Sequence, residues 1–271
     1  MSGRQAPAIE ASIAGIGFWT RGLPDWESAR AYVNAGTLPA DAPARPSSHL
    51  LAPNERRRAP ETVAVALNVA LAACTAAGRD PALLPSVFAS THGDLAITDY
   101  MCATLVEAPR TISPTRFHNS VHNAAAGYWT IGAGAQEPAT AISAYSATFA
   151  QGLLEALVQI ATGSEAVLLV AYDGTATGPL AKTSPSSGLL GGALLLVRDP
   201  VPETTRLSLR LENVDVDVAS SAAATGPLSN LAAGNAMTPM LPVFEALARR
   251  AANVSLAAGA GRVMHLEFDH A

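Results

Sequence analysis

The sequence predicts an α/β domain in which a largely enclosed sheet lies between layers of helices. Candidate strands and helices alternate over residues 1–200, which is the pattern of a layered α/β fold. Several strand candidates are continuous apolar runs, and such strands need cover on both faces. The 271 residues are 49% hydrophobic and 14% charged, which is enough to bury a large core. We expect one domain over residues 1–271, with a divergent part at 201–271.

The first elements follow from apolar spacing and from the residues that end each run. Residues 12–19 form a short apolar run that ends in turn residues, as a buried strand does. Residues 25–35 have helical spacing and are followed by glycine. The segment 37–59 is rich in proline, alanine and arginine without a period, so an extended connection is expected. Residues 60–78 begin with proline, repeat apolar residues at helical spacing and end in glycine, which predicts a helix.

The rest of the first block continues the alternation of strands and helices. A continuous apolar run predicts a buried strand, whereas longer stretches with apolar residues three and four apart predict helices. The strands are expected at 86–91, 140–145, 166–172 and 189–197, and the helices at 97–105, 121–132 and 147–162.

The last 70 or so residues have a different pattern. Three leucines at alternate positions are followed by three alternating valines in the opposite phase, so the pattern slips by one residue. A β-bulge or a break into two strands would explain this slip. The residues concerned are Leu207, Leu209 and Leu211, then Val214, Val216 and Val218. A loop at 219–236, a helix at 240–251 and a strand at 263–268 are expected to follow.

Composition excludes several classes of function. Lys+Arg 17 against Asp+Glu 22 gives a net charge of −5, and the one basic cluster is Arg56 to Arg58, so a nucleic-acid partner is not expected. No apolar run is long enough for a membrane span, and the N-terminus lacks the pattern of a signal peptide. Two cysteines are too few for a disulfide framework. We expect a cytoplasmic protein.

Ser146 is the first candidate nucleophile. It lies between a predicted strand and the start of a predicted helix, where free backbone N–H groups favour negative charge. Serine is also among the best N-cap residues, because its hydroxyl bonds a backbone N–H two or three positions on. Ala144 and Thr148 replace the glycines of the G-x-S-x-G motif. Residue type and position alone therefore favour the cap over the nucleophile.

Other polar residues are weaker candidates. His118 and His122 lie four apart and are expected to share a helix face, but the glutamate of H-E-x-x-H is absent, so no metal is expected. Neither G-x-G-x-x-G nor a Walker sequence occurs, so the glycines are expected to serve turns and close packing, and no cofactor is expected. The polar segment Ser90 to Asp94 follows a strand and fits either a functional loop or a helix N-terminus.

Three segments resemble a known family. They are RFHNSVHNAAAGYWTIG at 116–132, LLE at 153–155 and VAYD at 170–173. Together with the strand pattern from Ile9 to Val197, they resemble the β-ketoacyl synthases of the thiolase-like superfamily, with residues 1–200 matching the N-terminal half. The three segments are more specifically similar to the short chain length factors of aryl polyene and xanthomonadin-type pigment clusters.

The resemblance implies a thiolase-like fold and a noncatalytic role. It places Ser146 where the family has its cysteine, and the family's later histidine-containing motifs do not occur after Val197. Serine is a far weaker nucleophile than a thiolate. The implied function is a chain length factor that pairs with an active β-ketoacyl-ACP synthase, meets the acyl carrier protein through that heterodimer, and shapes the acyl tunnel. A homodimer is possible when the chain is alone.

The resemblance also assigns residues to the interface and the tunnel. The interface would comprise Phe117, His118, Val121, His122, Tyr128, Trp129, Ala141, Ile142, Ser143, Ala144 and Tyr145, with the strand 141–145 pairing across the dimer. The tunnel would be lined by Leu95, Ile97, Met101 and Phe149. Two alternatives remain open. One is a serine acyltransferase or thioesterase that uses Ser146 with His118 or His122 as base, and the other is a homodimeric acyl-chain binding protein.

Overall fold

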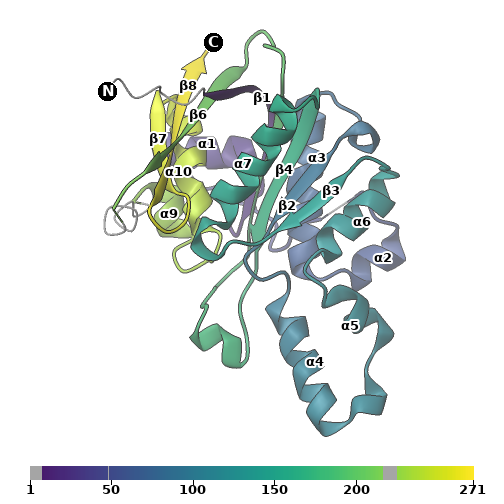
Figure 1. The fold of residues 1–271 in the computed structure, drawn as a ribbon. Helices are drawn as coiled ribbons and strands as arrows, with labels where there is room; N and C mark the ends of the chain where they lie inside the picture. Colours follow the sequence, from purple (N-terminus) through teal and green to yellow (C-terminus); the bar gives the residue numbers. More distant parts are fainter. Residues whose placement is uncertain (1–7, 48, 216–224) are drawn as a thin grey trace.

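The residues that the structure describes are built around one mixed sheet of eight strands in the order β3-β2-β4-β5-β1-β6-β8-β7 (Figure 1). The computed structural model describes residues 8–47, 49–215 and 225–271. The strands are β1 (Ile9–Thr20), β2 (Ser86–Ala89), β3 (Ala139–Ile142), β4 (Ala166–Asp173), β5 (Leu190–Val197), β6 (Thr205–Asn213), β7 (Asn253–Ala257) and β8 (Arg262–His270).

The two ends of this sheet differ in strand direction. The pairs β2 with β3 and β2 with β4 are parallel. All the other neighbours are antiparallel, and β1 lies between β5 and β6. Parallel neighbours need a crossover connection, and helices supply it in this fold. The sheet therefore has a parallel end at β3-β2-β4 and an antiparallel end at β6-β8-β7.

Helices cover both faces of the sheet along β2, β4 and β5. Among the described residues, no helix is long and apolar enough to cross a membrane. The α-helices are α1 (Trp26–Ala35), α2 (Pro53–Arg58), α3 (Glu61–Ala76), α4 (Leu95–Glu107), α5 (Pro114–Asn119), α6 (Ala124–Ala133), α7 (Thr148–Ala161), α9 (Pro227–Leu231) and α10 (Leu241–Arg249).

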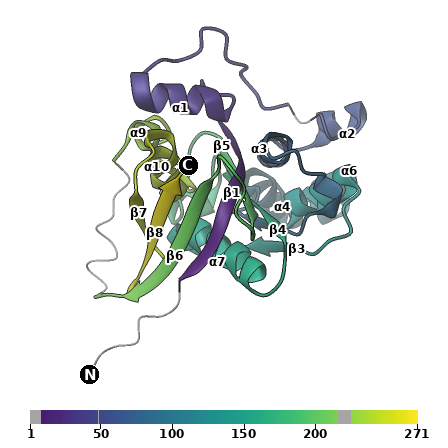
Figure 2. The ribbon, with the colours of Figure 1, turned by 90° about the horizontal axis from the view of Figure 1, so that it is seen from above.

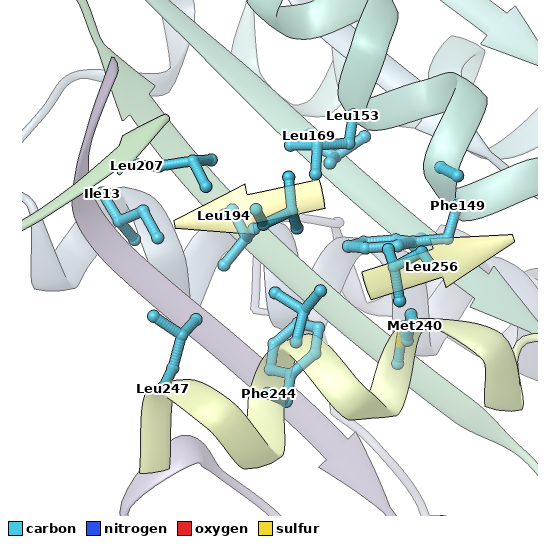
Figure 3. Close-up of a cluster of buried hydrophobic side chains, with 14 of the residues drawn as sticks. Ile13, Phe149, Leu153, Leu169, Leu194, Leu207, Met240, Phe244, Leu247 and Leu256 are labelled. Carbon is cyan, nitrogen blue, oxygen red and sulfur yellow. The ribbon is translucent and has the colours of Figure 1, made fainter. Parts of the chain in front are cut away.

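Two hydrophobic cores lie on opposite faces of the sheet. Helices α1, α7 and α10 pack on one face, and α3 and α6 pack on the other (Figure 2). Along β4 the side chains alternate between the two cores, so Leu169 belongs to the first and Leu168 to the second. Figure 3 shows the first core, where Phe244 of α10 lies among strand leucines and close to Phe149 of α7. The expected layered α/β fold with a covered sheet is what the structure contains.

Glycines in β1 allow α3 to pack against the strand backbone. A Cβ at Gly15 would lie 2.1 Å from the carbonyl oxygen of Ala73, and one at Gly17 would lie 2.0 Å from that of Val69. Side chains at either position would therefore push the helix away. This confirms the expected role of glycine in close packing.

The C-terminal part extends the same sheet. β6 pairs with β8 in unbroken register from Thr205 to Asn213, so no bulge interrupts it. Leu207 and Leu209 face the core, while Leu211 near the strand end is 39% exposed. The three alternating valines of the sequence pattern do not continue β6. Val214 follows the end of the strand, and Val216 and Val218 lie outside the described residues. The opposite face of this end is polar and open, as is common for antiparallel sheets.

Several elements differ from the sequence prediction. The expected helix at 121–132 corresponds to α6, which begins only at Ala124 because residues 120–123 form a turn, and the short helix α5 before that turn was not anticipated. The expected strand at 140–145 ends at Ile142 and is followed by a 3-10 turn. The segment 37–59 contains α2, the segment 219–236 contains α9, and β7 was not anticipated. These missed elements are five or six residues long, too short for a period to be recognised.

Candidate functional site

The three parallel strands β2, β4 and β3 end side by side, and the segments that follow them meet. Ser90 to Asp94 follows β2, Asp173 ends β4, and the turn with Tyr145 and Ser146 follows β3. The carboxyl ends of parallel strands are the usual place for a site in an α/β sheet. The site is therefore built upward from these three segments.

Asp173 is the buried centre of this region. Its side chain is fully buried and accepts hydrogen bonds from Ser90 Oγ at 2.7 Å, Thr91 N–H at 3.0 Å and His92 N–H at 3.2 Å. Burial raises the pKa of Asp173 above its ordinary value, and the hydrogen bonds from Ser90 and Thr91 oppose that rise. The carboxyl group thus fixes the path of the chain after β2.

The segment after β2 forms a helix N-terminus, which is one of the two alternatives expected for it. Asp94 is the N-cap of α4, because its side chain accepts from Ile97 N–H at 3.0 Å. His92 instead points its ring toward neighbouring side chains. Its Nε2 lies 2.6 Å from Ser184 Oγ, and its Nδ1 lies 3.9 Å from Asp173 Oδ1. The sequence gives no signal for Ser184, since it lies in no motif.

The turn after β3 is strained at Tyr145. Tyr145 has φ 52°, in the left-handed region that a bulky residue rarely adopts. Thr148 Oγ1 stabilises this turn, donating to the carbonyl of Tyr145 at 2.6 Å and accepting from Ala144 N–H at 2.9 Å. The N-cap of α7 is Ala147 and makes no side-chain bond, so the expected capping role of Ser146 is wrong. The hydroxyl of Thr148 stabilises the turn instead.

Ser146 is exposed and opens onto a pocket of about 960 Å³. The pocket lies between this turn, the segment of Ser184 and the C-terminal part of the chain. Its wall combines hydroxyl groups with small apolar residues. The lining includes Thr91, Tyr145, Ser146, Ser184, Asn230, Pro239, Pro242 and Leu256.

The two histidines expected to share a helix face contact groups other than Ser146. His118 lies in α5 and stacks edge-on against Tyr128 at 5.6 Å, whereas His122 lies in the turn before α6. His122 Nε2 is 2.7 Å from the carbonyl oxygen of Ser90. The two histidines therefore share no helix face, and no hydrogen bond joins either of them to Ser146 among the described residues. Within the residues that the structure describes, no group of three or more His, Cys, Asp or Glu side chains could hold a metal ion.

The residues expected to line a tunnel do not converge on one cavity. Leu95 and Ile97 line a second pocket of about 930 Å³, which also contains Arg21, Arg58 and Arg116. Met101 is buried on α4. Phe149 lies in the core of Figure 3, and it lines neither of the two pockets.

The residues expected at an interface lie at and near the parallel end of the sheet. β3 is an edge strand, so its outer edge is unpaired within the described chain. Phe117, Val121 and Tyr145 are 60%, 43% and 63% exposed, but Trp129 is fully buried in the second core. Trp129 therefore packs beneath this face and cannot touch a partner. His118, Ala141 and Ser143 are exposed, and His122, Tyr128, Ile142 and Ala144 are half-buried.

Comparison with known proteins assigns the family. Residues 26–260 match the family model described as the N-terminal domain of beta-ketoacyl synthase. This match covers most of the chain and continues well beyond residue 200. A search of the curated proteins found no match.

Solved structures share the fold at low sequence identity. One is a ketosynthase in complex with its chain length factor from Xenorhabdus doucetiae, at 23% identity and a TM-score of 0.71, covering 95% of this chain and 98% of the other. Another is the ishigamide ketosynthase/chain length factor, at 17% identity and a TM-score of 0.71, covering 95% and 99%. A third contains a type II polyketide synthase carrier protein with its ketosynthase, at 14% identity and a TM-score of 0.71, covering 98% and 100%.

These similarities confirm the resemblance to the β-ketoacyl synthases. The layered α/β structure is a thiolase-like ketosynthase fold, and the matched chains are covered almost completely. The chain belongs to the family of beta-ketoacyl synthase N-terminal domains.

Proposed function

We propose that this protein is a noncatalytic chain length factor that pairs with an active β-ketoacyl-ACP synthase. In this role it is a cytoplasmic protein that folds as one domain and helps to shape the acyl tunnel of an aryl polyene-type synthase. The observation that carries the proposal is the outer edge of β3, which pairs with no other described strand and lies beside exposed apolar side chains. An exposed edge strand favours pairing with another chain.

The chemistry at the turn after β3 supports a noncatalytic role. Condensation needs a thiolate to carry the acyl chain, and no cysteine lies at this turn. Cys74 is buried in the second core, where desolvation raises its pKa to about 12, and Cys102 lies on α4. Among the described residues, no hydrogen bond joins the hydroxyl of Ser146 to a histidine that could act as its base.

The exposed side chains near β3 are suited to a protein partner. Phe117, Val121, Ile131 and Tyr145 are 43% to 70% exposed, and α6, which carries Ile131, packs against β3. Large aromatic and aliphatic residues contribute most of the energy at interface centres. Two edge strands that pair would also satisfy the backbone groups of β3. The acyl carrier protein would then be met through the complex, and Leu95 and Ile97 remain candidates for the tunnel wall.

Co-expression tests this proposal. The chain is expressed with a β-ketoacyl-ACP synthase from the same gene cluster, and the molar mass of the purified species is measured by light scattering. We expect a 1:1 heterodimer. A stable monomer, or a homodimer that ignores the synthase, would contradict the proposal.

Two matched valine variants locate the interface. Val121 is 43% exposed near the proposed face, and Val201 is 38% exposed in the connection between β5 and β6. Val121→Asp should weaken the heterodimer at least tenfold, because it places a charge in an apolar interface. Val201→Asp should leave the affinity unchanged. Equal effects of the two variants would place the interface elsewhere.

A further inference from the structure

Ser184, His92 and Asp173 lie far apart in the sequence but follow one another in a line of contacts beside the pocket at Ser146. Ser184 Oγ lies 2.6 Å from His92 Nε2, and the other ring nitrogen, Nδ1, lies 3.9 Å from Asp173 Oδ1. His92 Nδ1 is buried and has no hydrogen-bond partner among the residues that the structure describes. A buried polar atom without a partner is rare and calls for an explanation.

The order of the three groups is that of a serine, a histidine base and a carboxylate. In hydrolases of this type, the carboxylate orients the histidine and stabilises its charged form, and the histidine takes the proton of the serine. The distance from His92 Nδ1 to Asp173 is longer than a hydrogen bond. Such contacts are often long without substrate and shorten when it binds.

Each member of the line is held by its surroundings. The carboxylate of Asp173 accepts the backbone N–H groups of Thr91 and His92, which fixes the start of the loop. Close to Ser184 in the chain is Ser186, whose hydroxyl donates to the carbonyl of Gly174 at 2.7 Å and accepts from Ala236 N–H at 3.0 Å. Groups fixed in this way are positioned before any substrate arrives.

The serine of this line faces open space. Ser184 lines the 960 Å³ pocket, whereas Asp173 is fully enclosed. The pocket wall contains small apolar residues and Leu256, which suit an acyl chain, and the start of α7 reaches its rim at Ala147. The N-terminus of a helix favours a developing negative charge.

We propose that Ser184 is a nucleophile for acyl thioesters, with His92 as its general base and Asp173 as a positioning residue. This inference goes beyond the proposed chain length function and stands independently of it: that function is noncatalytic in the condensation reaction, and hydrolysis at Ser184 is a separate reaction. It also differs from the sequence-based alternative, which used Ser146 with His118 or His122. The geometry supplies a base to Ser184 and none to Ser146.

The reaction balances without a cofactor. Ser184 Oγ attacks the thioester carbonyl as its proton passes to His92 Nε2, which gives a tetrahedral oxyanion. Collapse breaks the C–S bond, and the thiolate leaves with the proton from His92. Water then attacks the acyl-serine, His92 takes its proton and returns it to Ser184, and a carboxylic acid is released. The net reaction is thioester plus water to acid plus thiol.

Covalent labelling of the full chain tests the nucleophile. The chain is treated with a fluorophosphonate and, separately, with octanoyl-N-acetylcysteamine, and peptide mass mapping locates any adduct. We expect a fluorophosphonate adduct on Ser184 and hydrolysis of the thioester. An adduct on Ser146 instead, or no adduct under conditions that label a control serine hydrolase, would overturn the proposal.

Matched variants separate chemistry from folding. Ser184→Ala should abolish labelling. Ser255→Ala, at a serine whose Oγ lies 2.9 Å from His265 Nδ1 outside this pocket, should leave it unchanged. His92→Gln should slow labelling about 100-fold or more, which is the usual size of general-base assistance. Tm is measured for each variant so that only folded proteins are compared. Labelling at the wild-type rate in either His92→Gln or Ser184→Ala would overturn the proposal.

The positioning role of Asp173 has a spectroscopic readout. In the phosphonylated protein, a hydrogen bond from His92 Nδ1–H to Asp173 should give a low-field imidazole proton signal. Asp173→Asn should remove this signal. A folded Asp173→Asn protein that keeps the signal would show that another group holds Nδ1, and the carboxylate would lose its assigned role.

Discussion

The two ends of the sheet organise their polar residues in opposite ways. At the parallel end, the strands β2, β3 and β4 all finish at one edge, and their following segments bring Asp173, His92 and Tyr145 together. At the antiparallel end, charged residues face one another across strands on an open surface. The ion pairs there are Arg206 with Glu10 and Arg210 with Glu267, and His265 Nε2 lies 2.8 Å from Glu212 Oε2.

This difference shows how strand direction determines where a site can form. Parallel strands deliver several chain segments to one place, so buried groups from distant positions can meet there. Antiparallel neighbours place their loops at alternate ends, so the polar residues of β6 and β8 make mostly pairwise contacts across the sheet. The proposed interface and the group of Asp173, His92 and Ser184 lie at the first end. The second end completes the core and adds Leu256 to the pocket wall.

The largest expected effect tests whether the two ends unfold together. Phe244 of α10 is fully buried and contacts Phe18, Trp26 and Phe149, so it connects the C-terminal part to the first core (Figure 3). Phe244→Ala should lower the free energy of unfolding by about 3–5 kcal/mol through the cavity it leaves. Urea denaturation followed by circular dichroism should give one transition. Two separate transitions would mean that the ends are independent units.

The second prediction concerns the buried carboxyl group at the parallel end. Asp173→Asn weakens the hydrogen bonds of Ser90 and the loop backbone and should cost about 1–3 kcal/mol. Because the folded pKa of Asp173 is raised, the folded state binds the proton more tightly than the unfolded state. The contribution of Asp173 to the free energy of unfolding therefore falls as the pH rises from about 4 through the folded pKa.

Denaturation curves of the wild type and Asp173→Asn at several pH values measure this contribution. The asparagine does not titrate, so the stability gap between the two proteins should shrink as the pH rises. A gap that widens over the same range would show that folding favours the charged carboxylate and lowers the pKa of Asp173 instead of raising it.

A smaller effect is expected at the turn after β3. Thr148 is buried, and its hydroxyl makes two hydrogen bonds that close the strained turn at Tyr145. Thr148→Val keeps the shape but removes both bonds and should cost about 1–2 kcal/mol. Thermal denaturation measures the loss. Thr111→Val, at an exposed turn hydroxyl, serves as the control and should change Tm little.

The smallest effect is expected at the antiparallel end. Glu10 and Arg206 are joined at 2.7 Å, but both side chains are about half exposed. Exposed pairs of this kind contribute about 0–1 kcal/mol. Glu10→Gln should therefore leave the unfolding free energy nearly unchanged, and salt should reduce any difference further. A loss as large as that of Asp173→Asn would end the contrast between the two ends.

The parts of the fold that the sequence predicts well are those with a strong local signal. β4 is a continuous apolar run, and α1 is closed by Gly36 in the left-handed conformation, so both are predicted with nearly correct bounds. β7 is missed because Asn253 to Ala257 is short and half exposed. Ser146 is expected to cap α7, but it lies within the 3-10 turn that precedes this helix. The hydroxyl of Thr148 makes the hydrogen bonds of that turn instead.

The candidate site is harder to predict because its parts meet only after folding. His92 and Ser184 are 92 positions apart, and no motif surrounds Ser184. The spacing of His118 and His122 suggests a pair, but the chain turns between them. Trp129 was expected at the interface but is fully buried. The helical period places it on one face of the helix, but it does not tell whether that face meets the core or a partner.

The contact between α3 and β1 ties the molecule together mechanically. The backbone carbonyls of Ala73 and Val69 lie where any larger residue at Gly15 or Gly17 would need space, so the helix is seated in the strand. β1 is hydrogen-bonded to β5 on one side and to β6 on the other. A displacement of α3 would move β1 and distort its hydrogen bonds to β5 and β6. A force applied at either edge of the sheet is therefore distributed over all of its strands.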